Sequence, residues 1–173
     1  MNTSAVQQFI DAWGAMGTLW GINRSVARVH ALLMASKGPV SLDEIAERLG
    51  ISKGNASMSL RELRAFGVIR PVRTPGDRRD FYVSEPDVWA MFFRILAVRK
   101  RRELDPAVEA VQALLEGSDT RGPVRARFEQ MAELLESMES VSGQLLRNPG
   151  TARAAFRMLA RLTRKGAPGT GKK

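Results

Sequence analysis

The sequence contains no cysteine and one histidine, His30. The absence of cysteine excludes disulfides and thiolate metal sites, and it is compatible with a reducing cytoplasm. A single histidine has no second imidazole with which to build a metal site, and without a cysteine it builds no cysteine–histidine pair. We therefore expect His30 to be a packed side chain, and we expect the chain to hold no metal and no cofactor.

Long hydrophobic runs are also missing. The longest apolar stretch, Val88 to Val98, is interrupted by Arg94 and is shorter than the roughly 20 residues that span a bilayer. The N-terminus lacks a basic region and carries Asp11 inside its apolar stretch, which argues against a signal peptide. These features predict a cytoplasmic protein without a membrane partner.

The sequence contains no complete catalytic motif. Residues 166 to 172 have the GxxxxGK spacing of a phosphate-binding loop, but Lys173 stands where a working loop has serine or threonine. A helix rather than a strand is expected before it, and the carboxylates fall in helix caps and on solvated helix faces. We therefore predict that the chain is not an enzyme.

Positive charge is abundant and concentrated. The chain has a formal net charge of +9, and from Arg48 to Tyr82 eight Lys or Arg residues stand against three Asp or Glu. A basic balance fits a polyanionic partner, although charge alone does not identify one. The local sequence of residues 39 to 84 indicates which kind of partner this charge serves.

Residues 39 to 84 predict two short helices joined by a tight turn. Ser41 and Glu44 have the spacing of a capping box at the start of the first helix. Gly50 follows its last turn, where a left-handed backbone costs least without a Cβ. Ser52 then caps a second helix after only a few residues, which is the interval of a helix-turn-helix.

The second helix has one apolar face and one polar-basic face. Ala56, Leu60 and Leu63 recur at helical spacing and predict its buried stripe. The opposite side offers donors and acceptors suited to base edges and phosphates, and an ordinary solvated face is the alternative. Asn55, Ser57 and Met58 are predicted to choose the sequence, while Lys53 and Arg61 mainly anchor. The predicted DNA-binding residues of this helix are Ser52, Lys53, Gly54, Asn55, Ser57, Met58 and Arg61.

A basic hairpin follows. Residues 68–73 and 81–84 have the composition of two short strands, and Pro75-Gly76-Asp77 marks the reversal between them. Arginine side chains at the tip and along the edge suit a wing that grips the sugar-phosphate backbone. The predicted wing contacts are Arg73, Arg78 and Arg79.

Together these segments resemble the GbsR-like branch of the MarR-type transcriptional regulators. The residues that carry the resemblance are SLDEIAERLGISKGNASMSLREL, GVIRPV and GDRRDFYVSEPDVWAMFFRIL, within a match from about Arg24 to Pro106. The resemblance implies a dimeric, cytoplasmic bacterial DNA-binding regulator whose affinity for DNA responds to a small molecule. The last third of the chain is matched only in its helical character.

The flanking segments are predicted to be helical. An amphipathic helix is expected from Thr3 to about Met16, followed by a break at Gly14, Gly17 and Gly21, and Asn23 is expected to cap the next helix. Further on, Asp105 and Pro106 are expected to start a short helix that Gly117 ends. A long helix with a coiled-coil seam, widened by Leu134 and Val141, and a last helix after Asn148-Pro149 complete the pattern.

The predicted fold class is therefore mainly α, with a winged helix-turn-helix domain, a small β-hairpin wing and an α-helical dimerisation region. We divide the chain into residues 1–22, an N-terminal helix that contributes to dimerisation; 23–103, the DNA-binding domain and linking helix; 104–165, the helical dimerisation and effector region; and 166–173, a flexible basic tail. The predicted dimerisation residues are Val6, Ile10, Val124, Phe128, Met131, Leu135, Met138 and Leu145.

The sequence favours a homodimeric, sequence-specific regulator of transcription that binds double-stranded DNA and acts as a repressor. A small-molecule effector would lie against aromatic side chains, since these attract cations, although plain core packing is the alternative for them. The residues concerned are Trp13, Trp20, Trp89 and Phe92. A non-specific nucleoid-type DNA binder and a winged-helix protein-protein adaptor remain open as other functions.

Overall fold

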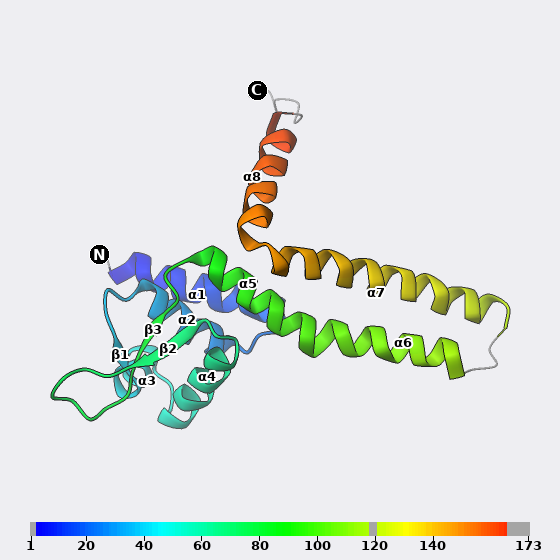
Figure 1. The fold of residues 1–173 in the computed structure, drawn as a ribbon. Coiled ribbons are helices and arrows are strands. Elements are labelled where there is room, and N and C mark those ends of the chain that lie inside the picture. The colour runs from blue at the N-terminus through cyan, green and yellow to red at the C-terminus, as the bar shows by residue number, and fades with distance from the viewer. Residues whose placement is uncertain (1–2, 118–120, 166–173) are drawn as a thin grey trace, which may run out of the picture. The chain divides into compact units, whose positions relative to one another are not determined.

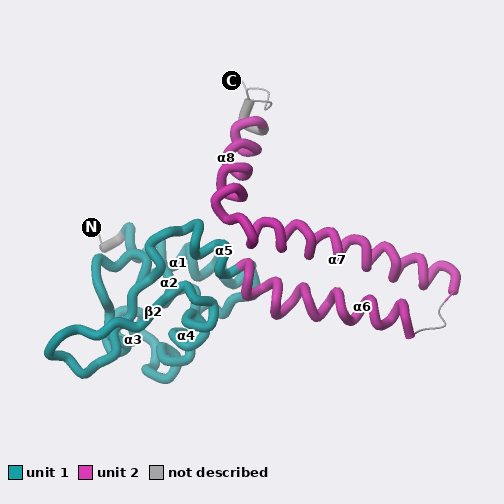
Figure 2. Tube along the Cα trace, in the orientation of Figure 1, with its two compact units in different colours: residues 1–95 teal, residues 96–173 magenta. Residues whose placement is uncertain are grey.

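The structure is a computed structural model that describes residues 3–117 and 121–165. The chain forms two compact units with their boundary between Ile95 and Leu96 (Figures 1 and 2). We call them the winged unit and the C-terminal unit. The elements are α1 (Thr3–Leu19), α2 (Arg24–Ala35), β1 (Val40–Ser41), α3 (Leu42–Leu49), α4 (Lys53–Ala65), β2 (Ile69–Val72), β3 (Phe81–Ser84), α5 (Val88–Arg99), the π-helical segment η1 (Lys100–Leu104), α6 (Asp105–Gly117), α7 (Pro123–Arg147) and α8 (Pro149–Lys165).

The predicted winged helix-turn-helix is confirmed. Helices α3 and α4 form the helix-turn-helix, and β2 and β3 form the antiparallel wing. The two-residue strand β1, which the sequence pattern did not predict, pairs with β3, so that the order in the sheet is β1-β3-β2. Pro71 lies in β2 at the edge of this sheet, the position where proline is tolerated in a sheet.

The helix caps of the winged unit follow the sequence closely. Asn23 accepts from the backbone N–H of Ser25 at 2.8 Å, and Ser52 accepts from that of Asn55 at 3.1 Å. Ser41 and Glu44 form the full capping box, and Gly50 has the left-handed φ of 62°. These caps satisfy backbone N–H and C=O groups that the helix ends would otherwise leave unpaired, and they fix where α3 stops and α4 begins.

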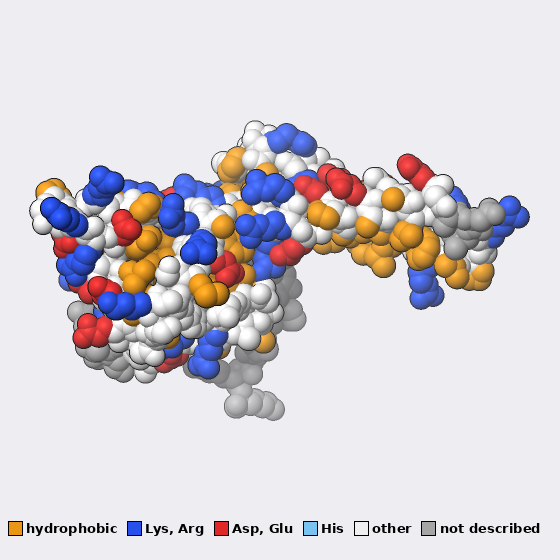
Figure 3. All heavy atoms as spheres, turned by 90° about the horizontal axis from the view of Figure 1, so that it is seen from below, with side chains coloured by type: hydrophobic (Ala, Val, Ile, Leu, Met, Phe, Trp, Pro, Cys, Tyr) orange, Lys and Arg blue, Asp and Glu red, His pale blue; other side chains and the backbone are white. Residues whose placement is uncertain are grey.

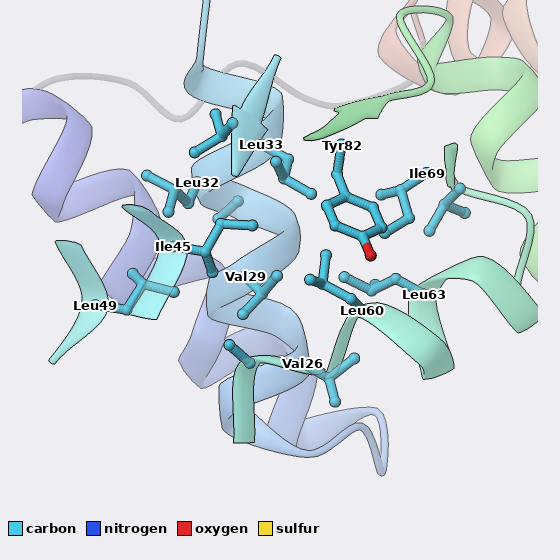
Figure 4. Close-up of a cluster of buried hydrophobic side chains, with 14 of the residues drawn as sticks. Val26, Val29, Leu32, Leu33, Ile45, Leu49, Leu60, Leu63, Ile69 and Tyr82 are labelled. Atoms are coloured by element: carbon cyan, nitrogen blue, oxygen red, sulfur yellow. The ribbon is translucent and has the colours of Figure 1, made fainter. Parts of the chain in front are cut away.

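The core of the winged unit is built around α2. Val29 and Leu32 of this helix, Ile45 of α3 and Leu60 of α4 are each at most 2% exposed. Tyr82 of β3 closes the cluster on the side of the sheet (Figure 4). The inner stripe predicted for α4 is therefore buried in this core, and its orientation determines which residues of α4 face outward.

The glycines of α1 differ from their prediction. Gly14 and Gly17 do not break the helix, because α1 continues to Leu19. A Cβ on Gly14 would lie 2.7 Å from Cγ of Arg28, and one on Gly17 would lie 2.5 Å from Cβ of Ala27. Both glycines therefore let α1 and α2 approach closely, which is a requirement of packing that hydrophobic periodicity does not reveal.

The helix predicted from Asp105 to Gly117 is present as α6, but Asp105 does not cap it. The chain stays helical from α5 through α6, and Asp105 has the helical φ and ψ of −57° and −46°. The backbone N–H of Asp105 donates to the carbonyl of Lys100, five residues earlier, as in a π-helix. We attribute the continuity to this wider turn, because an ordinary α-helical turn would bring the Pro106 ring against a backbone carbonyl four residues earlier.

The C-terminal unit is centred on the antiparallel hairpin of α6 and α7 (Figure 1). Lys100 joins η1 to α7, since its Nζ lies 2.6 Å from a carboxylate oxygen of Asp105 and 3.1 Å from one of Glu139. The pKa of Lys100 is raised, and the largest cause is the hydrogen bond that its ammonium donates to Asp105. This ion pair fixes the π-helical segment against the long helix that follows.

Membrane spans and metal clusters are both absent from the described residues. Within residues 3–117 and 121–165, no helix is long and apolar enough to cross a bilayer. The same residues contain no group of three His, Cys, Asp or Glu side chains arranged to hold a metal ion. The stretch with phosphate-loop spacing, residues 166–172, lies outside the described residues.

Candidate nucleic-acid interface

The residues that α4 buries in the core determine which of its residues face outward. Ala56, Leu60 and Leu63 are at most 4% exposed in the core, and Ser59 is buried beside them, so Met58 and Arg61 point away from it. Met58 is 69% exposed, and Lys53 and Arg61 are exposed as well. A helix that presents apolar and cationic tips on one free face has the chemistry to contact base edges and phosphates in a major groove.

Gly54 and Ser57 complete this face in different ways. A Cβ on Gly54 would meet only Oγ of Ser52, at 3.9 Å, so the backbone at this point is open to close approach. Ser57 is half-buried. The hydroxyl of Ser52 accepts the capping hydrogen bond of α4. The role of Ser52 is therefore to fix where the helix starts.

Asn55 is exposed, but its side chain is hydrogen-bonded within the chain. Its amide nitrogen donates to Oγ of Ser25 on α2 at 3.2 Å, and its amide oxygen accepts from Oγ of Ser59 at 3.3 Å. The sequence pattern assigned Asn55 to base reading, but these hydrogen bonds use both ends of its side chain to join α4 to the start of α2. In this arrangement Asn55 positions the reading helix.

An acidic residue that the sequence pattern did not single out lies beside α4. The Nζ of Lys53 is 2.7 Å from a carboxylate oxygen of Asp43, with both side chains about half exposed or more. Such surface pairs contribute little to stability. Asp43 instead holds the Lys53 ammonium at one place and competes with phosphate for it. Only the folded chain shows this, since the two residues belong to different helices.

The wing arginines fall into two kinds. Arg79 forms several hydrogen bonds to the Asp77 carboxylate, the shortest at 2.6 Å, and its guanidinium lies 5.2 Å from the centre of the Phe81 ring. These hydrogen bonds lower the pKa of Asp77 to about 2. Arg78 is exposed, and in the described part of the chain it has no ion pair. Arg78 is therefore the more available cation at the tip.

Two shallow hollows flank the wing. One, of about 310 Å³, is lined by Arg78 and Arg79 together with Asp43 at the start of α3. The other, of about 290 Å³, is lined by Arg64 of α4 and Arg73. Cations from α4 and from the wing therefore border the same part of the winged unit, and the predicted wing residue Arg73 lies beside the C-terminal half of α4.

The aromatic residues predicted for an effector pocket lie at different places. Trp13 packs against His30, with ring centroids 6.1 Å apart, and Trp89 meets Phe92 edge-on at 6.3 Å. Trp20 is 60% exposed at the end of α1. His30 is 4% exposed, and burial lowers its pKa to about 4. It is neutral at pH 7, which agrees with a packed side chain.

The predicted dimerisation residues are also of two kinds. Ile10 is 2% exposed inside the core of the winged unit, and Val6 packs against that core, so their apolar atoms are already used within the chain. The seam on α7 splits into two stripes. Phe128, Leu135 and Leu145 are half-buried, whereas the other members stay about half exposed: Val124, Met131 and Met138.

Known proteins resemble this chain in the same region. Residues 20–80 match the family described as MarR family. The chain is 28% identical over 103 residues to the HTH-type transcriptional repressor GbsR of Bacillus subtilis, an alignment that covers 60% of this chain and 57% of that repressor. The resemblance predicted from the sequence is confirmed, although it spans little more than half of the GbsR length.

Two further matches extend beyond the winged unit. The HTH-type transcriptional regulator MmpR5 of Mycobacterium tuberculosis is 29% identical over 143 residues, which cover 82% of this chain and 84% of that regulator. A solved structure described as a crystal structure of a transcriptional regulator superposes with a TM-score of 0.66 at 23% identity, and it covers 85% of this chain and 99% of that one. At this identity the second match supports the fold alone.

Proposed function

We propose that the chain, whose residues 20–80 match the MarR family, is a sequence-specific, DNA-binding transcriptional regulator that acts as a homodimer and represses its targets. One observation carries the proposal. The inner face of α4 is locked into the core, so that its polar-basic outer face lies free beside an arginine-bearing wing in the same unit. Repression is supported by the similarity to GbsR, which is a repressor.

In this proposal α4 enters the major groove. Ser57, Met58 and Arg61 meet the base edges, and Met58 suits the methyl group of thymine. Asn55 keeps α4 at its angle to α2 through the hydrogen bonds to Ser25 and Ser59. Lys53 exchanges the Asp43 carboxylate for a phosphate when DNA arrives.

The wing takes the backbone and the neighbouring minor groove. Arg78 neutralises a phosphate, while Arg79, already ordered by Asp77, follows the groove with little further loss of side-chain freedom. Two copies read one face of the duplex when their α4 helices stand about 34–36 Å apart. A single chain contains one α4, so the subunit interface must set this spacing.

Control by a small molecule is part of the proposal. An effector changes DNA affinity only if it binds the two spacings of the dimer unequally. The pair Trp89 and Phe92 offers aromatic faces for a cationic ligand. Trp89 is half-buried, and Phe92 is 41% exposed, which leaves one ring of this pair open to solvent.

The test is fluorescence anisotropy with the DNA upstream of the chain's own gene and a scrambled duplex of the same composition. Arg78→Ala should weaken binding to both duplexes and reduce the slope of log affinity against log salt by about 0.9 for each phosphate that is no longer neutralised. Arg127→Ala is the matched control, because Arg127 is an exposed arginine of α7 in the C-terminal unit, and it should leave the slope unchanged.

The other functions give different results in the same titration. A nucleoid-type binder holds the scrambled duplex as tightly as the upstream DNA, and an adaptor binds neither. Either result rejects the proposed function. An unchanged salt slope for Arg78→Ala, with specific binding intact, rejects only the assignment of the wing.

A further inference from the structure

A carboxylate lies within the proposed DNA-binding surface, where it would repel a polyanion. Asp43 of α3 forms an ion pair with Lys53 in the first turn of α4, with Nζ 2.7 Å from a carboxylate oxygen. Asp43 also lines the hollow of about 310 Å³ that Arg78 and Arg79 of the wing border. Figure 3 shows acidic side chains among the Lys and Arg side chains on the face of the winged unit that it views. Asp43 therefore lies beside both the reading helix and the wing.

The start of α3 does not depend on the Asp43 carboxylate. Ser41 and Glu44 complete the capping box without it, because the backbone N–H of Ser41 donates to the Glu44 carboxylate at 3.0 Å and that of Glu44 donates to the Ser41 hydroxyl at 3.3 Å. Among residues 3–117 and 121–165, Lys53 is the one side chain that forms an ion pair with Asp43. An exposed pair of this kind adds little to stability. Its position among the cations of the interface points instead to a role in binding.

The charge of Asp43 also acts on the wing. The pKa of Arg79 is raised, first by its hydrogen bond to Asp77 and, among the smaller causes, by the negative charges of Glu44 and Asp43. Before DNA binds, carboxylates thus engage Lys53 at the start of α4 as well as Arg79 in the wing. Of these two contacts, the one to Lys53 joins different helices, so it depends on how α3 and α4 pack.

The competition between a carboxylate and a phosphate for Lys53 depends on how well the phosphate is placed. Asp43 offers the ammonium an anion at one fixed position, 2.7 Å away. On DNA without the matching sequence, no base contacts seat α4, and the phosphates face Lys53 at varying distances where salt screens them. When base contacts seat α4 in the groove, one phosphate is held close to Lys53 and takes it from the carboxylate.

We infer that Asp43 is a specificity-determining residue, which keeps Lys53 from the phosphates of unmatched DNA and releases it only in the specific complex. This inference rests on the function proposed above. Non-specific binding comes almost entirely from phosphate contacts, so the loss of one such contact widens the difference between specific and non-specific affinity. Through Lys53, the unchanged chain neutralises one phosphate more on its own site than on a scrambled duplex.

Asp43→Asn tests the inference in the full-length chain, because it removes the charge with little change of shape. Anisotropy titrations with the upstream and the scrambled duplex are run between about 50 and 200 mM salt. On the scrambled duplex, the slope of log affinity against log salt should steepen by about 0.9, and the affinity at the lowest salt should rise on the order of tenfold. On the upstream duplex the slope should stay unchanged, and the affinity should rise less than about threefold.

Glu47→Gln is the matched control. Glu47 is exposed on α3, one turn after Asp43, and the substitution removes the same charge. No ion pair of Glu47 exists within the described residues. The control should leave both slopes unchanged. A Glu47→Gln chain that steepens the scrambled slope as much as Asp43→Asn overturns the inference, because any lost negative charge on α3 would then have the same effect.

A second background separates the release of Lys53 from the general loss of a negative charge. In a Lys53→Gln chain, the further change Asp43→Asn should no longer steepen the slope on the scrambled duplex. A steepening that persists without the Lys53 ammonium overturns the inference, since the carboxylate would then act by repelling DNA and not by holding that cation.

The outcomes separate this inference from the proposed function. When the unchanged chain prefers its upstream DNA, the function stands, and an unchanged scrambled slope or equal changes on both duplexes for Asp43→Asn overturn the inference alone. A loss of affinity for the upstream duplex also overturns it, because Asp43 would then accept a hydrogen bond from a cytosine amino group. An unchanged chain that binds both duplexes equally overturns the function, and with it the role of Asp43 in specificity.

Discussion

The two units of the chain use apolar residues in opposite ways. In the winged unit, α2 is surrounded by α1, α3, α4 and the sheet, and the largest fully buried side chains of the described residues all belong to it, among them Leu32, Ile45 and Leu60. In the C-terminal unit, α7 and α8 leave Leu134, Val141 and other apolar side chains more than half exposed. The winged unit buries its apolar side chains in a core of its own. The C-terminal unit leaves many apolar side chains of α7 and α8 exposed.

The difference follows from geometry. Three helices and a sheet enclose a volume, and side chains in it lose nearly all contact with water. A helical hairpin encloses little, because each helix has only one neighbour and an amphipathic stripe wider than that contact remains outside. This comparison indicates that the winged unit folds by itself, whereas the C-terminal unit reaches its full stability by association.

The largest expected effect contrasts one leucine from each unit. Leu60→Ala should lower the free energy of unfolding by about 2–5 kcal/mol, because it leaves a cavity in a closed core. Leu134→Ala should change it by less than about 0.5 kcal/mol in dilute, monomeric protein. Urea unfolding followed by helical circular dichroism measures both. If Leu134→Ala costs as much as Leu60→Ala at low concentration, the two units do not differ as described.

A second prediction uses pH to examine the closed core. His30 has a pKa near 4 in the folded chain and about 6.5 when unfolded, so between these values the unfolded chain binds more protons. The free energy of unfolding is therefore unaffected above about pH 6.5 and falls as the pH drops from 6.5 towards 4, by up to about 3 kcal/mol.

His30→Leu is the control for this pH dependence. All three tryptophans, Trp13, Trp20 and Trp89, lie in the winged unit, so their fluorescence during urea unfolding reports on that unit. The variant should lose the part of the pH dependence between pH 4 and 6.5. An identical slope in His30→Leu and in the unchanged chain would show that His30 is not the group responsible.

The smallest effect compares two helical glycines. Gly17→Ala should destabilise the winged unit by about 1–3 kcal/mol, because the new Cβ would lie 2.5 Å from that of Ala27. Gly143→Ala in α7 meets only the flexible end of Arg147, at 3.6 Å, and should stabilise its helix by up to about 1 kcal/mol. Thermal unfolding of both variants provides the measurement. A Gly17→Ala chain as stable as the unchanged chain would contradict the close packing of α1 on α2.

Much of the winged unit is predictable because its signals are local. The caps at Asn23, Ser41 and Ser52, the turn at Gly50 and the buried stripe of α4 each depend on residues within a few positions of one another. The same is true of the wing, where Pro-Gly-Asp marks the turn. The sequence resemblance to GbsR-like regulators rests on this stretch as well, and the comparisons confirm it there.

The differences concern residues whose roles depend on distant partners. Gly17 was interpreted as a helix breaker, but it lies against Ala27 in a helix that continues past it. For Asn55, predicted as a base contact, the pattern did not reveal the hydrogen bond that it donates to Ser25, thirty residues earlier. Asp105 was interpreted as a helix cap because the pattern does not reveal the π-helical turn before it, although α6 has the predicted bounds.

The sequence by itself therefore determined the order of helices, the helix-turn-helix, the wing and the excess of positive charge on them, since helix propensity, caps, turns and charge act over short distances. Only the tertiary structure decided which cations are held by carboxylates, as Lys53 is by Asp43, and which apolar stripes are buried or exposed. Ion pairing and burial depend on which surfaces meet in space. The spacing of residues along the sequence does not specify which distant residues become the neighbours of a side chain.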